Sequence, residues 1–155
     1  MRFTTLAATL LLVSSCTSVS VQKVDAHEYP MHLVCTEHNE KVLGNDLVPV
    51  IEAGFLRHGI RTKVCSEGVQ PDCEYSLWYT GLRGWDITPF LKHVELRLKH
   101  NGETIATATY HHSGGLGLNK WASTQSKLTP VIDELLAEFG PQATPGAESQ
   151  ISSPP

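Results

Sequence analysis

The sequence predicts a single α+β domain, a two-layer sandwich in which two helices cover one face of a mixed sheet of four or five strands. The chain has 155 residues, of which 41% are apolar; this suffices for one buried core and is too little for two ordinary domains. Its apolar patterns follow the order β-α-β-β-β-β-α. A parallel, right-handed β-α-β unit followed by an antiparallel meander buries all of these apolar faces.

Five strands are expected. The clearest is one in which Val94, Leu96 and Leu98 alternate with polar residues, the pattern of a strand with one buried face. Asn101-Gly102 then favours a type I′ hairpin turn, so the following segment should return as the antiparallel partner. The expected strands span residues 32–37, 60–65, 73–82, 91–99 and 103–111.

Two helices complete the predicted domain. Asn45 or Asp46 can cap the first helix, and Pro49 lies in its first turn, where a missing N–H costs nothing. Apolar residues at helical spacing predict the second helix over residues 128–139, and Thr129-Pro130 is a suitable start for it.

The first 16 residues have the features of a bacterial lipoprotein signal. Arg2 precedes a short apolar run, Leu6 to Val13, which is too short to span a bilayer. Val13-Ser14-Ser15-Cys16 resembles a lipobox, which implies that the Cys16 sulfur is acylated and that Cys16 becomes the mature first residue. Two or three acyl chains anchor a protein stably. The alternative is an ordinary signal peptide that is cleaved nearby, with Cys16 incidental.

These signals predict a division of the chain. Residues 1–15 form the signal peptide, residues 16–30 a lipidated tether, residues 31–140 the domain and residues 141–155 a disordered tail rich in Pro, Ser and Gly. Thr17 in place of Asp after the lipidated Cys implies the outer membrane, with the domain facing the periplasm. The membrane is therefore the first expected partner. The net charge of −4 does not indicate the basic surface that nucleic-acid binding requires.

Three cysteines remain in the domain, so one must stay unpaired within the chain. Two pairings are geometrically sensible: Cys65–Cys73 would close a short loop, and Cys35–Cys73 would join the first strand to the third. No CxxC motif supports redox catalysis.

The eight histidines raise the question of a metal site. Counting outward from the Asn101-Gly102 turn places His93 opposite Tyr110, so that His93 and His112 share a face while His111 starts on the other. With a neighbouring carboxylate they could bind Zn or Cu. Because no metal-binding spacing is present, we predict no cofactor and keep His93, His111 and His112 as a weak candidate set.

No catalytic signature is present, so we expect no enzyme. Ser113-Gly114-Gly115 lacks the GxSxG pattern of a nucleophile elbow, and the glycine run that contains it lacks the dinucleotide fingerprint.

The most suggestive surface is Arg83, Trp85 and Trp121, because tryptophan buries a large area at low entropic cost in binding patches. The alternative is that the tryptophans pack over the open end of the sheet. If exposed, the three residues form a patch for an envelope protein or glycan partner.

Three stretches resemble a family of bacterial envelope lipoproteins, the Sbal-type lipoproteins: KVLGNDLVPVIEAGFLRHGI, PDCEYSLWYTGLRGWDITPFLKHVELRLKHNGETIATATYHH and LNKWASTQSKLTPVIDELL. The most specific pieces are Trp85-Asp86 and Lys120-Trp121, and the resemblance covers about residues 32–139. It implies a location in the envelope and the fold, lends no activity, and favours the Cys35–Cys73 pairing. Our own expectation for the function is an accessory or binding protein of an envelope complex. At the level of the fold, the pattern is also similar to the amino-terminal domain of TolB-like proteins and to curli-secretion lipoproteins.

Overall fold

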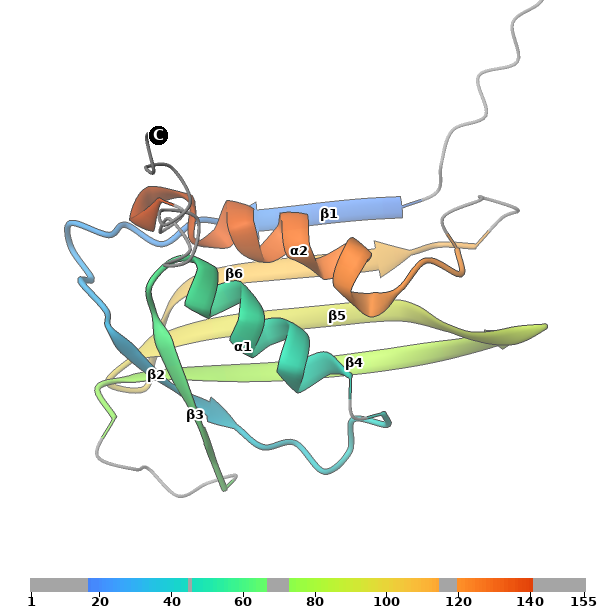
Figure 1. Cartoon of the computed structure of the whole chain (residues 1–155), viewed down its shortest axis with the longest axis horizontal. Coiled ribbons are helices and arrows are strands. Elements are labelled where there is room, and N and C mark those ends of the chain that lie inside the picture. Colours follow the sequence, from blue (N-terminus) through green and yellow to red (C-terminus); the bar gives the residue numbers. More distant parts are fainter. Residues whose placement is uncertain (1–16, 45, 67–72, 115–119, 141–155) are drawn as a thin grey trace, which may run out of the picture.

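Both helices lie over one face of a single mixed sheet (Figure 1). The computed structural model describes residues 17–44, 46–66, 73–114 and 120–140. The predicted α+β class is confirmed. In chain order the elements are β1 (Thr17–Gln22), β2 (Leu33–Glu37), α1 (Leu47–Arg57), β3 (Arg61–Cys65), β4 (Tyr75–Asp86), β5 (Thr88–His100), β6 (Glu103–His112) and α2 (Thr124–Leu135), with a 3₁₀ turn at Ala137–Phe139.

The sheet has six strands in the order β1-β6-β5-β4-β2-β3, so the predicted count of four or five is wrong. Strand β2 runs parallel to β3 and β4, as the expected β-α-β unit requires. The remaining neighbours are antiparallel. The additional strand is β1, which pairs with β6 along its whole length and lies at one edge of the sheet.

Strand β1 lies inside the segment predicted to be a tether, so that prediction is wrong for residues 17–30. The sequence of β1 alternates small polar residues with Val19 and Val21, which suits a sheet edge. Val24 and Met31 are fully buried, and the Val24 N–H donates to the Leu135 carbonyl at 3.1 Å. Cys16, the predicted signal peptide and the predicted tail lie outside the described residues.

The β5–β6 hairpin has the predicted turn but a different register. Asn101 and Gly102 both have positive φ, 49° and 87°, as a type I′ turn requires. Two residues later the pairing shifts, because β6 contains an extra residue, Ile105, between the partners of Leu98 and Lys99. A shift of one residue reverses which side chains share a face, so the histidine register counted from the turn is wrong.

Helix α2 begins earlier than predicted, at Thr124. The Ser123 hydroxyl accepts a hydrogen bond from the Ser126 N–H at 3.1 Å and caps the helix. Pro130 therefore lies inside the helix rather than at its start. The apolar pattern did not indicate this earlier start, because the first turn of α2 is polar and carries little of the apolar stripe of the rest of the helix.

The two helices approach each other closely at Gly54. A Cβ atom added there would lie 2.6 Å from Cγ2 of Ile132, a buried residue of α2. Glycine in a helix interior is normally unfavourable by about 1 kcal/mol relative to alanine. At this position the contact requires it, because an added methyl group would overpack the core between α1 and α2.

We expect Gly54→Ala to lower the free energy of unfolding by about 1–3 kcal/mol, because overpacking outweighs the gain in helix propensity. The measurement is urea denaturation of Gly54→Ala, Ile132→Ala and the double variant. In the Ile132→Ala background, Gly54→Ala should cost less or become stabilising. Additive effects across this cycle would contradict the contact as the cause.

Candidate functional site

The β4–β5 hairpin extends beyond the other strands (Figure 1). Its turn carries exposed apolar side chains. Trp85 is 76% exposed and Ile87 is 81% exposed, and both lie at the turn. Trp121, from the segment before α2, is 41% exposed. We call Trp85, Ile87 and Trp121 the tip patch. It retains both tryptophans of the predicted partner surface and adds Ile87, which sequence patterns did not single out.

The tip is fastened to the body of the domain through Asp86. The Lys120 ammonium group forms an ion pair with the Asp86 carboxylate, and Trp121 Nε1 donates to the Asp86 carbonyl at 3.2 Å. On the neighbouring strand, Phe90 lies against Gly84, where an added Cβ would be 2.4 Å from the ring. The Lys120 Nζ lies 4.7 Å from the centre of the same ring. These contacts hold the exposed side chains on a supported hairpin.

Ile87 has an unfavourable backbone conformation. Its φ is +55°, in the left-handed region that β-branched residues rarely adopt. Such a residue costs on the order of 1–3 kcal/mol, and an exposed side chain gains little packing in return. An apolar, strained and exposed residue at the end of a braced hairpin marks the tip as a candidate binding surface.

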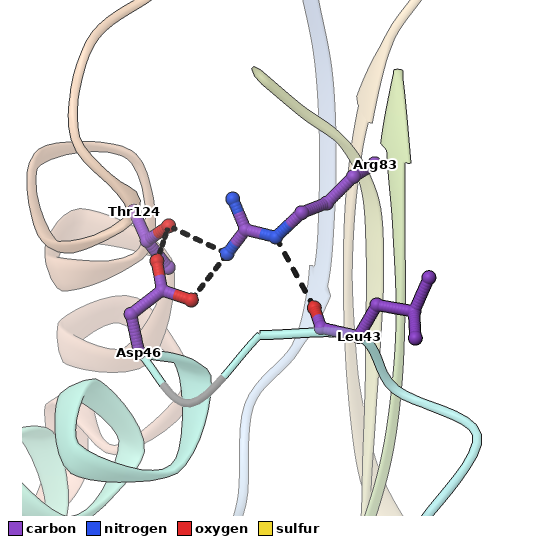
Figure 2. Close-up of polar contacts among 4 residues, drawn as sticks. All are labelled: Leu43, Asp46, Arg83 and Thr124. Carbon is purple, nitrogen blue, oxygen red and sulfur yellow. Dashed lines mark hydrogen bonds and ion pairs between the residues drawn. The ribbon is translucent and has the colours of Figure 1, made fainter. Parts of the chain in front are cut away.

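Arg83, the third residue of the predicted patch, has a different role (Figure 2). Its Nε donates to the Leu43 carbonyl at 3.2 Å, and its guanidinium forms an ion pair with Asp46. Thr124 completes the cluster by donating from Oγ1 to Asp46 Oδ2 at 2.5 Å. The cluster joins β4 to the amino-terminal ends of both helices. The structure therefore uses the Arg83 charge internally and does not add it to the tip patch.

Asp46 occupies the N-cap position of α1, yet its side chain makes no capping hydrogen bond. Burial by itself would raise the pKa of Asp46. The hydrogen bonds from Thr124 and Arg83, and the positive charge of Arg83, outweigh burial and hold this pKa below its usual value. The Asp46 carboxylate thus connects β4 to the two helices. It does not cap α1, contrary to what the sequence suggested.

We expect Asp46→Asn to lower the free energy of unfolding at pH 7 by about 1 kcal/mol, since the group is partly exposed. Because the folded-state pKa is lowered, this stabilisation is complete above the unfolded pKa and is lost as pH falls through the folded one. Chemical denaturation between pH 7 and pH 3 should show the variant and wild type converging in acid. Glu95→Gln, which breaks the ion pair with Arg97 on the same strand, is the control and should cost less at pH 7.

The three candidate metal-binding histidines do not come together. His93 and His111 face each other across β5 and β6 on the face away from the helices, with ring centroids 5.6 Å apart. His112 is buried on the helix-covered face, where its ring meets Phe90 edge-on and its Nδ1 lies 3.2 Å from Thr17 Oγ1. Among the described residues, no group of three or more His, Cys, Asp or Glu side chains could hold a metal.

His112 lies in a buried, positively charged environment. Burial lowers its pKa, and the charges of Lys127, Lys120 and His111 lower it further. Lys127 is also buried, and its Nζ donates to the Lys120 carbonyl at 2.6 Å. Burial, followed by the charge of Arg83, lowers the Lys127 pKa too. This end of the domain therefore favours a neutral His112 in the folded state.

Folding stability should therefore fall as pH drops below about 6.5, because the unfolded chain takes up a proton on His112 more readily than the folded chain. We expect His112→Phe to reduce the loss of unfolding free energy between pH 7 and pH 5.5. The measurement is denaturation at a series of pH values. His111→Phe, an adjacent change on the other face, should leave the loss largely intact; an equal effect of the two variants would contradict the assignment.

Cys35 and Cys73 form a disulfide, with their Cα atoms 6.0 Å apart. It joins β2 to the segment that leads into β4. Of the two pairings left open by the residues themselves, this is the one that the family resemblance favoured. Cys65, at the end of edge strand β3, is a free thiol.

A separate surface pocket of about 350 Å³ lies where the carboxyl-terminal parts of the two helices meet. Asp133 Oδ1 accepts hydrogen bonds there from Arg57 at 2.7 Å and pairs with His58 Nε2 at 3.1 Å. Sequence patterns treated His58 only as part of the α1 stripe. Arg57 and His58 both bind the Asp133 carboxylate, so the arrangement joins α1 to α2. The other ring nitrogen of His58, Nδ1, is buried and has no hydrogen-bond partner.

No protein-family model matches the chain, and no curated protein matches it. The solved structures that resemble this chain include two forms of one protein. A PelC dodecamer from Paraburkholderia phytofirmans has 14% sequence identity and a TM-score of 0.49, covering 82% of this chain and 99% of that one. A point variant of the same dodecamer has 15% identity and a TM-score of 0.47, covering 74% and 96%. Likeness at this level gives no argument about function.

No helix in the described part of the chain has both the length and the apolar character needed to cross a bilayer.

Proposed function

We propose that this chain is a lipid-anchored protein of the bacterial cell envelope with a non-enzymatic, accessory binding role. The observation that carries the proposal is the Ser14-Ser15-Cys16 sequence at the end of a short apolar segment. The outer membrane, with the domain facing the periplasm, is the location we propose. The resemblance of residues 32–139 to Sbal-type lipoproteins supports the same location in the cell envelope.

Two structural features support this proposal. The Cys35–Cys73 disulfide suits an oxidising compartment outside the cytoplasm. The tip patch supplies an exposed apolar surface on a braced hairpin, as a binding protein needs. Anchoring by lipid would raise the effective concentration of this patch near other envelope components. Binding, and not catalysis, is therefore the activity that the chain's features favour.

A periplasmic small-ligand or metal-binding protein is the alternative. It rests on the His93–His111 pair, in which His93 Nδ1 is buried and has no hydrogen-bond partner. Zinc sites use three or four protein ligands, and this pair supplies only two. The pair therefore supports metal binding less strongly than the lipobox supports a lipid-anchored protein. One Zn²⁺ or Cu²⁺ per chain that survives extensive dialysis, and is lost in His93→Ala, would reverse that order.

We expect the mature protein from membrane fractions to have an intact mass that begins at Cys16 and includes two or three acyl chains. Cys16→Ser should abolish the lipid mass and move the protein out of the membrane fraction, because no sulfur remains to acylate. Cys65→Ser is the matched control and should stay in the membrane fraction. A wild-type protein without lipid would overturn the proposal.

A further inference from the structure

We infer that the tip patch enters the headgroup layer of the membrane in which Cys16 is anchored, as a second membrane contact beside the lipid. The inference rests on the proposed lipid anchor and names the surface that the patch contacts. It commits to a lipid surface as the occupant of the patch; a protein or glycan on the tip is an alternative outcome of the test.

The start of β1 and the turn between β4 and β5 lie at the same end of the sheet (Figure 1). Thr17 begins β1 opposite His112, the last residue of β6. The preceding residue, His111, pairs with His93, so Thr17 stands level with Lys92 of β5. Cys16 is bonded to Thr17, and consecutive Cα atoms are about 3.8 Å apart. A lipid on Cys16 therefore holds this end of the domain, and not the opposite end, against the bilayer.

The start of β1 and Trp85 lie close enough in height for both to reach the same membrane surface. Trp85 pairs with Pro89, three residues beyond Lys92, or about 10 Å along the strand. Strands β1 and β4 are three spacings apart, about 14 Å. A tilt of the sheet relative to the bilayer thus brings Trp85 and Cys16 to similar depth. The headgroup layer, about 5–7 Å on each side, accommodates the remaining difference.

The side chains at the tip suit an interface between lipid and water. Tryptophan is enriched at the headgroup level, where its ring is partly buried and its N–H stays hydrated. Ile87 adds an apolar side chain at the turn. Asp86, the carboxylate between them, is paired with Lys120, so no unpaired negative charge approaches the lipid. Lys92 is exposed at the level of the anchor, a position that suits a phosphate headgroup.

The structure also explains why a strained apolar turn would be retained here. Isolated apolar side chains are ordinary on a surface, but Trp85 and Ile87 are 76% and 81% exposed and lie within the same turn. Ile87 has a left-handed backbone in which asparagine or glycine is the usual residue. A polar residue would relieve the strain and remove the apolar contact together, which makes the position a direct test.

The experiment uses the full-length acylated protein, reconstituted in phosphatidylcholine vesicles with and without bromine-labelled acyl chains, which quench nearby tryptophan fluorescence. We expect the quenched fraction of wild-type emission to fall in Trp85→Phe, and to fall at least twofold when Trp121, the other tryptophan of the tip patch, is also changed to Phe. Trp78 is the matched control, because it lies in the middle of the sheet beneath Arg97; Trp78→Phe should leave the quenched emission unchanged or increase its share. Equal quenching in wild type and Trp85→Phe would overturn the inference.

Ile87→Asn gives an independent measurement that does not alter any tryptophan. We expect the variant to fold, to remain anchored through Cys16, and to show at least twofold weaker bromine quenching. Leu82→Asn removes an exposed apolar side chain of the same hairpin, level with His93 and away from the tip, and should not weaken quenching. Equal effects of the two variants would overturn the tip contact.

The failure of this inference is distinguishable from the failure of the proposed function. An acylated, vesicle-bound protein whose Trp85 is not quenched would overturn only the tip contact, and the patch would be reassigned to a protein or glycan partner. A chain whose mass shows no acyl group would overturn the anchor and the tip contact together.

Discussion

The long antiparallel pairing of β4 with β5 is the constraint on which the rest of this structure depends. It runs from Tyr75 opposite His100 to Asp86 opposite Thr88 and occupies the middle of the sheet. In the half of the pairing that begins at Tyr75 and His100, fully buried leucines form the layer on which the helices pack: Leu77, Leu96 and Leu98. At its far end the same two strands leave the body and present the tip patch. One pairing therefore forms both the core and the candidate binding surface.

The two ends of this pairing are stabilised by different physical means. At the end nearer His100, alternating side chains bury apolar surface. This hydrophobic stabilisation is non-directional. Towards the tip there is little apolar surface to bury, and directional contacts replace it. Arg83 bonds to Asp46 beside the helix ends, and Asp86 bonds to the segment that carries Lys120 and Trp121. These polar contacts allow a hairpin to extend beyond its sheet and still hold a defined position.

Two β-bulges explain most of the difference between the predicted site and the observed one. The extra residue at Ile105 moves His112 into the core and sets His93 opposite His111. A second shift lies between Leu82 and Arg83, within strands that extend beyond the predicted bounds 73–82 and 91–99. A bulge adds one residue to one strand only, and it has no strong local composition. Counting from a turn therefore predicts partners well near Asn101 and poorly farther along the strand.

The sequence by itself determined the α+β class, the β5–β6 turn and the apolar stripe of α1, because each depends on local periodicity or a contiguous motif. Only the tertiary structure decided that residues 17–22 join the sheet, since a short polar edge strand is stabilised by its partner and not by its own residues. It also decided that Arg83 binds Asp46 and Thr124, which lie 37 and 41 residues away along the chain. Contacts at that separation depend on how the layers meet, and no local pattern encodes them.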